Sequence, residues 1–278
     1  MKKILSVSVA AYNLESMIRQ CLDSFIRPEI LEKVEVLVTD DGSKDQTREI
    51  VAEYEKKYPG SFKLIVQKNA GPGSTVNSGL AHATGKYFRM VDGDDWVNTN
   101  EMEAYLTYLE EHDTDMVCTS YCCVDHETGE KRLEMLKTDI MDREIQFEQV
   151  AKDLFLAMHN VTYKTSILKE NSIRLDNGFY TDLEYLLFPT PYIHTVAFLS
   201  QTIYMYRVSL STQSMSIKSL QKNVQMHRNV LEHLLREYEA YHMSAHWNAS
   251  IGSYYCKRIA ATVGTQLSIY LSFKDTKT

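Results

Sequence analysis

The chain has 278 residues, a formal net charge of −7 and a hydrophobic content of 44%. This composition is ordinary for a globular protein and excludes a largely disordered chain. An acidic chain lacks the basic surface that general nucleic-acid binding requires, so we predict no nucleic-acid partner. The odd number of cysteines, five, indicates reduced thiols rather than a disulfide framework.

Strand and helix patterns alternate through the first 120 residues. The strand patterns lie at 4–10, 34–39, 62–66, 87–91 and 116–119. Apolar residues at helical spacing lie between them, at 14–25, 43–58, 76–83 and 102–109. Such alternation predicts an α/β fold in which helices cover a parallel sheet.

The second half of the chain is less regular. Charged residues at 121–145 predict a loop or hairpin, and further patterns predict a helix at 147–158, a strand at 203–208 and a helix at 220–241. Residues 259–273 carry no charge, but their glycine, glutamine and hydroxyl side chains favour a packed helix over a membrane span. An interfacial or partner-binding role is the alternative for that segment.

Polar residues follow each of the first four predicted strands. They are Tyr12-Asn13, Asp40-Asp41-Gly42-Ser43, Asn69-Ala70-Gly71 and Asp92-Gly93-Asp94-Asp95. The carboxyl ends of parallel strands meet at one edge of a sheet, where open α/β sheets bind ligands. We therefore predict a binding site formed by these four segments.

Two common nucleotide-binding motifs are missing from the expected places. A dinucleotide site needs G-x-G-x-x-G after the first strand, where this chain has Ala11-Tyr12-Asn13, and Gly85-Lys86 lacks the upstream glycine of a P-loop. Carboxylates at a strand end repel phosphate, but they can hold Mg²⁺ or Mn²⁺, which bridges to a diphosphate. The alternative is a turn in which Asp94 or Asp95 caps the next helix.

The four strand-end segments closely resemble the motifs of GT-A-fold family 2 glycosyltransferases, in that family's order and spacing. The resemblance rests on residues 7–13, 38–47, 69–73 and 90–96. It implies a GT-A-type nucleotide-binding fold, with a mostly parallel central sheet flanked by helices and a C-terminal helical segment. It also implies an inverting transfer of a sugar from a UDP-sugar to a glycan or lipid-linked acceptor, in surface polysaccharide or glycoconjugate synthesis.

The resemblance assigns roles to individual strand-end residues. Asp92 and Asp94 form its D-x-D pair; Asp94 is the expected ligand of Mn²⁺ or Mg²⁺, and Asp92 lies nearer the ribose or sugar and shares the metal. Tyr12 is expected to stack near the base, Asp41 to accept a hydrogen bond from it, and Asp40 to support the loop. The other predicted donor-binding residues are Ala10, Asn69, Gly71 and Arg207.

The resemblance places the general base in the second half of the chain. Asp182 matches the family's catalytic aspartate, although Thr181 replaces the usual glutamate before it. Glu184 is the competing candidate, about half a helical turn away, so the two carboxylates would not face one acceptor. Arg207 either pairs with phosphate or braces the sheet.

We divide the chain into a nucleotide-sugar-binding part (1–120), an acceptor-binding and catalytic-base part of the same domain (121–216) and a C-terminal helical region (217–278). Without an evident export signal we expect a cytoplasmic protein. Peripheral contact with the inner face of the membrane, through the C-terminal region, and homo-oligomerisation are left open. The alternative function is a non-catalytic nucleotide-sugar-binding protein, which Thr181 keeps open. A sugar-nucleotide pyrophosphorylase is a further alternative, but it would need a glycine-rich loop with an arginine directly after the first strand, and this sequence has none there.

Overall fold

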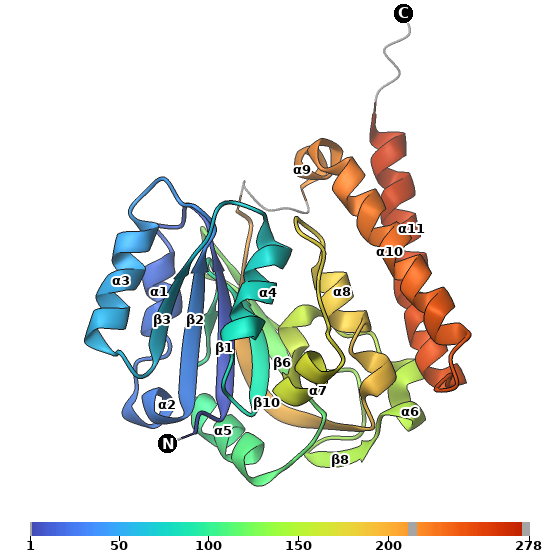
Figure 1. Cartoon of the computed structure of the whole chain (residues 1–278), viewed down its shortest axis with the longest axis horizontal. Coiled ribbons are helices and arrows are strands. Elements are labelled where there is room, and N and C mark those ends of the chain that lie inside the picture. The colour runs from blue at the N-terminus through green and yellow to red at the C-terminus, as the bar shows by residue number, and fades with distance from the viewer. Residues whose placement is uncertain (1, 211–215, 274–278) are drawn as a thin grey trace, which may run out of the picture.

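The structure is a computed structural model that describes residues 2–210 and 216–273 (Figure 1). Residues 1, 211–215 and 274–278, which fall at the edges of the three predicted parts, lie outside the described residues. A single ten-stranded sheet crosses the molecule in the order β3-β2-β1-β4-β9-β6-β10-β5, with β7 and β8 paired to β6 and β10. The strands are β1 (Leu5–Ala11), β2 (Val34–Asp40), β3 (Phe62–Val66), β4 (Tyr87–Asp92), β5 (Trp96–Val97), β6 (Met116–Asp125), β7 (Lys131–Glu134), β8 (Arg143–Gln146), β9 (Val161–Lys164) and β10 (Thr195–Val208).

The first four strands are parallel, as the alternation predicts. β1 lies between β2 and β4, with Ala11 opposite Asp40 and Ala10 opposite Asp92. This register brings the carboxyl ends of the three strands level, so the segments that follow them begin at one edge of the sheet.

Beyond β4 the sheet is mixed. β9, from the second half of the chain, is inserted between β4 and β6 and runs antiparallel to both. β4 and β6 therefore still point the same way, and β10 lies parallel to β6. β10 is also longer than the predicted strand at 203–208.

Helices flank the sheet (Figure 1). They are α1 (Ile18–Asp23), α2 (Pro28–Lys33), α3 (Thr47–Lys57), α4 (Pro72–His82), α5 (Met102–Glu111), α6 (Phe147–Val150), α7 (Thr165–Glu170), α8 (Asp182–Leu187), α9 (Ile217–Lys222), α10 (Val224–His242) and α11 (Ala249–Ser272). α4 packs on β1 and β2, and α3 packs on β2 and β3.

The predicted helix at 147–158 is wrong. α6 ends after four residues and a short 3-10 turn follows it. Leu154 and Leu156 are buried while Phe155 between them is exposed. This alternation belongs to an extended segment, whose every second side chain reaches the core.

α10 and α11 pack against each other and stand beside α8 (Figure 1). One cluster of buried apolar side chains extends from Leu5 to Ile269. α11 buries Ile259, Thr262 and Gln266 against the rest of the protein, so the prediction of a packed helix is confirmed. None of the described helices combines the length and apolar character needed to cross a bilayer.

Candidate active site

The loops after β1 and β2 are tied together by their own polar groups. The backbone N–H of Asn13 donates to Oγ of Ser43 at 3.0 Å, and the N–H of Lys44 donates to Oδ1 of Asn13 at 2.8 Å. Asn13 has a φ of 53°, a conformation that asparagine tolerates well. The side chain of Tyr12, just before it, is 44% exposed at the end of β1.

Asp40 has a structural environment. It is fully buried, its carboxylate pairs with the Arg48 guanidinium at 2.8 Å, and it accepts the N–H of Ser43 at 3.1 Å. These contacts hold the turn after β2 and agree with the supporting role predicted for Asp40.

Asp41 holds the loop after β3. Its Oδ1 accepts the N–H of Ala70 at 2.9 Å and an amide hydrogen of Gln67 at 2.7 Å, and its Oδ2 accepts the N–H of Gly71 at 2.8 Å. An ionised carboxylate offers about four acceptor positions, so one is left for a ligand donor. Asn69, in the same loop, is exposed.

The Asp92-Gly93-Asp94-Asp95 turn brings three carboxylates together, with oxygens within 4.8 Å of one another. Asp95 is only 1% exposed and accepts Tyr204 Oη at 2.6 Å and the N–H of Arg207 at 2.7 Å, which anchors the turn to β10. Asp92 and Asp94 are half-buried and face no such partner among the described residues. The carbonyl of Ala10 accepts the N–H of Gly93 at 3.0 Å, which ties the turn to β1.

Burial and mutual repulsion make this turn electrostatically unusual. Burial, with the charges of Asp94 and Asp182, raises the pKa of Asp92 to about 7. Burial also raises the pKa of Asp94, and the nearby Arg207 charge opposes that rise. Because hard divalent cations prefer oxygen ligands and offset such repulsion, Asp92 and Asp94 fit Mg²⁺ or Mn²⁺.

Arg207, in β10, contacts the backbone of the acidic turn. Its Nε donates to the Asp94 carbonyl at 2.7 Å and its Nη2 donates to the Gln20 side chain at 2.7 Å. The guanidinium also stacks on Trp96, 4.8 Å from the ring centre. These contacts support the bracing role of Arg207 over phosphate binding.

The loop before Asp182 packs directly on the loop after β3. The N–H of Gly73 donates to the carbonyl of Gly178 at 3.1 Å. A Cβ at Gly71, which has a φ of 92°, would lie 2.6 Å from Cα of Gly178, and one at Gly73 would lie 1.9 Å from the Asp176 carbonyl oxygen. Only glycines allow this approach, and it brings α8, which begins at Asp182, toward the acidic turn.

Asp182 is half-buried and close enough to Asp92 for its charge to raise the pKa of that residue. Burial raises the pKa of Asp182 itself, and the charges of Arg258 and His227 oppose this. Asp92, from the first half of the chain, and Asp182, from the second half, therefore interact electrostatically. Sequence reasoning missed Arg258 and His227, whose only signal is a polar position on an otherwise buried helix face.

The carboxylate of Glu184 contacts α10 and not the acidic turn. Its side chain is fully buried, and it accepts the N–H of Asp176 at 2.6 Å and a hydrogen bond from Nδ1 of His233 at 2.9 Å. Burial raises its pKa to about 7. Asp176, Glu184 and His233 also bring ligand atoms within 4.8 Å of one another, but their hydrogen bonds already join them. Glu184 thus holds the Asp182 loop to α10.

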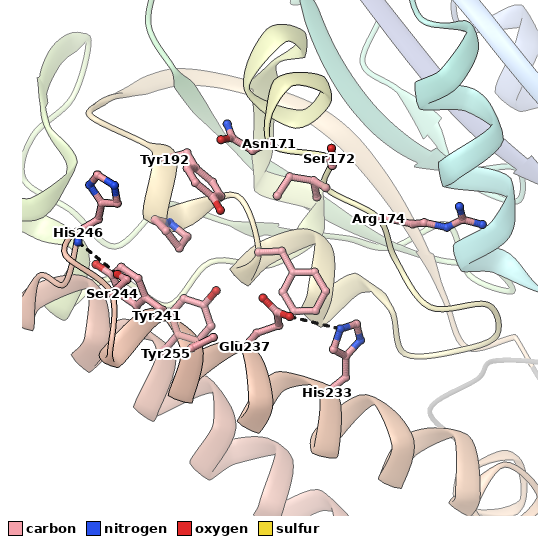
Figure 2. Close-up of a pocket in the computed structure, with 14 residues that line it drawn as sticks. Asn171, Ser172, Arg174, Tyr192, His233, Glu237, Tyr241, Ser244, His246 and Tyr255 are labelled. Atoms are coloured by element: carbon pink, nitrogen blue, oxygen red, sulfur yellow. Dashed lines mark hydrogen bonds and ion pairs between the residues drawn. The ribbon is translucent and has the colours of Figure 1, made fainter.

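A cavity of about 280 Å³ is lined by His233 and Glu237 of α10 and by the chain around Tyr192. Figure 2 shows these side chains around it. It is lined mainly by aromatic and polar side chains. None of the predicted site residues is among the described residues that line it. The cavity is therefore separate from the acidic turn.

Known proteins resemble this chain in sequence. The family model described as "Glycosyl transferase family 2" matches residues 6–171. EpsH of Bacillus subtilis (strain 168) is 28% identical over 217 residues, which are 75% of this chain and 62% of EpsH. The poly(ribitol-phosphate) beta-glucosyltransferase of Bacillus spizizenii is 28% identical over 176 residues, 61% of this chain and 26% of that protein. The chain thus spans less than two thirds of the length of these relatives.

A solved structure with a similar fold is S. aureus TarS 1-349 in complex with UDP-GlcNAc. It superposes with a TM-score of 0.64 at 21% sequence identity and covers 99% of this chain and 74% of TarS 1-349. At this identity the likeness concerns the fold, and it confirms the predicted GT-A-type α/β architecture.

Proposed function

This chain belongs to glycosyl transferase family 2, and on that premise we propose that it transfers a sugar from a UDP-sugar to a glycan or lipid-linked acceptor with inversion at the anomeric carbon. The observation that carries the proposal is the packing of the Gly71–Gly73 loop on the loop before Asp182. That contact joins the predicted donor-binding segments to the predicted base. Residues 1–120 would then bind the donor, and 121–216 would supply the base and acceptor contacts.

Asp182 is the proposed general base. It would take the proton of an acceptor hydroxyl while that oxygen attacks the anomeric carbon from the face opposite the leaving diphosphate. A raised pKa makes a carboxylate a stronger base, and burial raises the pKa of Asp182. General-base assistance contributes about 10²–10⁴ in rate.

The donor side is proposed to use the strand-end residues. Tyr12 is exposed beside the base site, Asp41 retains an acceptor position, and Asp94 with Asp92 would hold Mn²⁺ or Mg²⁺. When bound, the cation neutralises charge on the departing nucleoside diphosphate. Ala10, Asn69 and Gly71 would border the ribose and sugar.

The relatives support the direction of this proposal. TarS binds UDP-GlcNAc in its solved complex, and the Bacillus spizizenii relative is named for glucosyl transfer to poly(ribitol phosphate). We therefore propose a UDP-sugar donor and a role in the synthesis of a surface polysaccharide or related glycoconjugate.

The test is a transfer and donor-hydrolysis assay with UDP-glucose and UDP-GlcNAc in the presence of Mn²⁺. We expect the wild-type protein to turn over the donor and Asp94→Ala to lose the activity that Mn²⁺ supports. In Asp182→Asn we expect kcat to fall by a factor of about 10²–10⁴. Asp139→Asn, at an exposed carboxylate that is not among the predicted site residues, is the control.

Full activity of both site variants would overturn the assignment. Binding of UDP by calorimetry without any turnover would instead favour a nucleotide-sugar-binding protein, the alternative that Thr181 in place of the family's glutamate suggests.

A further inference from the structure

Three arginine side chains are buried among the described residues, and one of them differs from the others. Arg89 donates to Oγ1 of Thr162 at 2.9 Å and to the His159 carbonyl, and Arg207 is held by the acidic turn. Arg258, in α11, is 8% exposed, yet it donates no hydrogen bond and forms no ion pair with any described residue. Its contact is with the ring of Phe155, 4.2 Å from the guanidinium carbon.

Arg258 belongs to a polar stripe on the buried face of α11. Tyr254, Arg258, Thr262 and Gln266 follow one another at intervals of four residues, and all four are buried. Residues at this spacing lie on one face of a helix. Within the described part of the chain, the Tyr254 hydroxyl, Nε of Arg258 and Nε2 of Gln266 have no hydrogen-bond partner.

The stripe lies next to the proposed catalytic base. Oε1 of Gln266 is 2.7 Å from Nδ1 of His227, and the His227 ring packs edge-on against Tyr180, 5.1 Å between ring centres. Tyr180 is two residues before Asp182. Burial raises the pKa of Asp182, and the charge of Arg258 is close enough to oppose that rise. Arg258 and Asp182 form no ion pair in the described part of the chain, and Nε of Arg258 has no hydrogen-bond partner there.

Burying a cation and amide donors without partners is costly, and native proteins rarely retain such groups. A guanidinium is well suited to bind a phosphate through two parallel hydrogen bonds. Phe155, which covers the guanidinium face, is itself 64% exposed, so movement of one surface side chain would open the way to solvent.

We propose that Arg258 forms an oxyanion subsite that binds a phosphate group of the acceptor beside Asp182. The proposal rests on the proposed function and specifies the acceptor as a phosphate-bearing alcohol, such as a polyol phosphate. The base side of the site is where an acceptor hydroxyl must lie, which places its neighbouring phosphate near α11. The polymer named for the Bacillus spizizenii relative, poly(ribitol phosphate), has this chemistry.

The experiment titrates the full-length protein with sn-glycerol 3-phosphate and, separately, with glycerol, by calorimetry. We expect the phosphate to bind and glycerol not to bind, with the affinity reduced at least tenfold in Arg258→Gln and partly retained in Arg258→Lys. Arg236→Gln, at an exposed arginine of α10, is the matched control and should bind as the wild type does. Equal binding by the wild type and Arg258→Gln, or no phosphate binding at all, would overturn the subsite.

Two further measurements distinguish an acceptor phosphate from the donor diphosphate and test whether the Arg258 variant is stably folded. Saturating UDP with Mg²⁺ should leave glycerol phosphate binding in place; displacement by UDP would assign Arg258 to the donor diphosphate and contradict an acceptor subsite. Without ligand, Arg258→Gln should melt at the wild-type temperature or a few degrees above it, because the variant removes an unpaired buried charge. A clear fall in Tm would mean that Arg258 is a structural residue.

The proposed function and the subsite fail in different ways. Absence of donor turnover in the wild type would reject the transferase, whereas turnover combined with unchanged phosphate binding in Arg258→Gln would reject only the subsite.

Discussion

At the scale of single residues, two carboxylates two positions apart in one helical turn have opposite environments. Asp182 is half-buried and interacts with the charge of Asp92, while Glu184 is fully buried and bonded to Asp176 and His233. The first environment suits a group that exchanges a proton with a ligand. The second suits a group that holds a loop in place, so the two residues compete for no common role.

The environment of Glu184 predicts a pH-dependent stability. Burial raises its pKa from 4.5 to about 7, so the folded protein holds this proton more tightly than the unfolded chain. The contribution of Glu184 to folding is therefore full below about pH 4.5 and is lost as the pH rises through about 7. Glu184→Gln, which cannot ionise, should be more stable than the wild type at pH 8.5, by on the order of 3 kcal/mol.

The measurement is thermal unfolding of both proteins between pH 5 and 8.5, with Glu239→Gln, at an exposed glutamate of α10, as the control. The advantage of Glu184→Gln should shrink toward pH 5. A difference in Tm that is constant across this range would contradict the buried ionisation of Glu184.

At the scale of elements, the site depends on two loops that come from different halves of the chain. Asp41 gathers the loop after β3 through three hydrogen bonds, and the glycines of that loop pack on the backbone around Gly178. Asn77 of α4 strengthens the contact by exchanging two hydrogen bonds with the backbone of Leu175, at 2.8 and 3.0 Å. The position of Asp182 is thereby coupled to that of the donor loop.

Gly73→Ala should disturb this contact. Its Cβ would lie 1.9 Å from the backbone oxygen of Asp176, so one of the two loops must move, at a cost of about 1–3 kcal/mol. We expect a lower Tm and at least a tenfold fall in kcat/KM for transfer. Gly60→Ala is the matched control, since no atom lies within 4 Å of its added Cβ. Wild-type activity and stability of Gly73→Ala would show that the loops do not depend on each other.

At the scale of the whole molecule, the C-terminal helices are part of the same core as the sheet. The apolar cluster is continuous from Leu5 to Ile269, and Tyr255 of α11 donates its hydroxyl to the Leu187 carbonyl at the end of α8, at 2.8 Å. A chain of 278 residues is near the size at which proteins divide into separate domains. The shared core favours one cooperative unit that contains the predicted parts 1–120, 121–216 and 217–278.

The two tryptophans of the chain allow a direct test of this unit. Trp96 reports on the acidic turn, and Trp247 reports on the junction of α10 and α11. Trp96→Phe and Trp247→Phe each leave one fluorescent probe, and we expect both variants to show a single urea transition that coincides with the loss of helical circular dichroism. An earlier transition at Trp247 alone would mean that the C-terminal helices unfold independently.

The sequence by itself determined the parallel half of the sheet, the packed character of the C-terminal helix and the four strand-end segments around which the site is built. These features follow from local periodicity and from the rule that parallel strands end at one edge, so they need no knowledge of distant contacts. The supporting role of Asp40 could also be predicted from the sequence, because its partners Ser43 and Arg48 are close to it in the chain.

Only the tertiary structure decided the insertion of β9, the bracing contacts of Arg207, the different environments of Asp182 and Glu184, and the place of the α11 polar stripe. Each depends on which residues far apart in sequence become neighbours. His233 is 49 residues from Glu184, and Gln20 is 187 residues from Arg207. Burial and electrostatic environment depend on which residues the folded chain brings together, so aspartates with the same side chain have different hydrogen bonds and different pKa shifts.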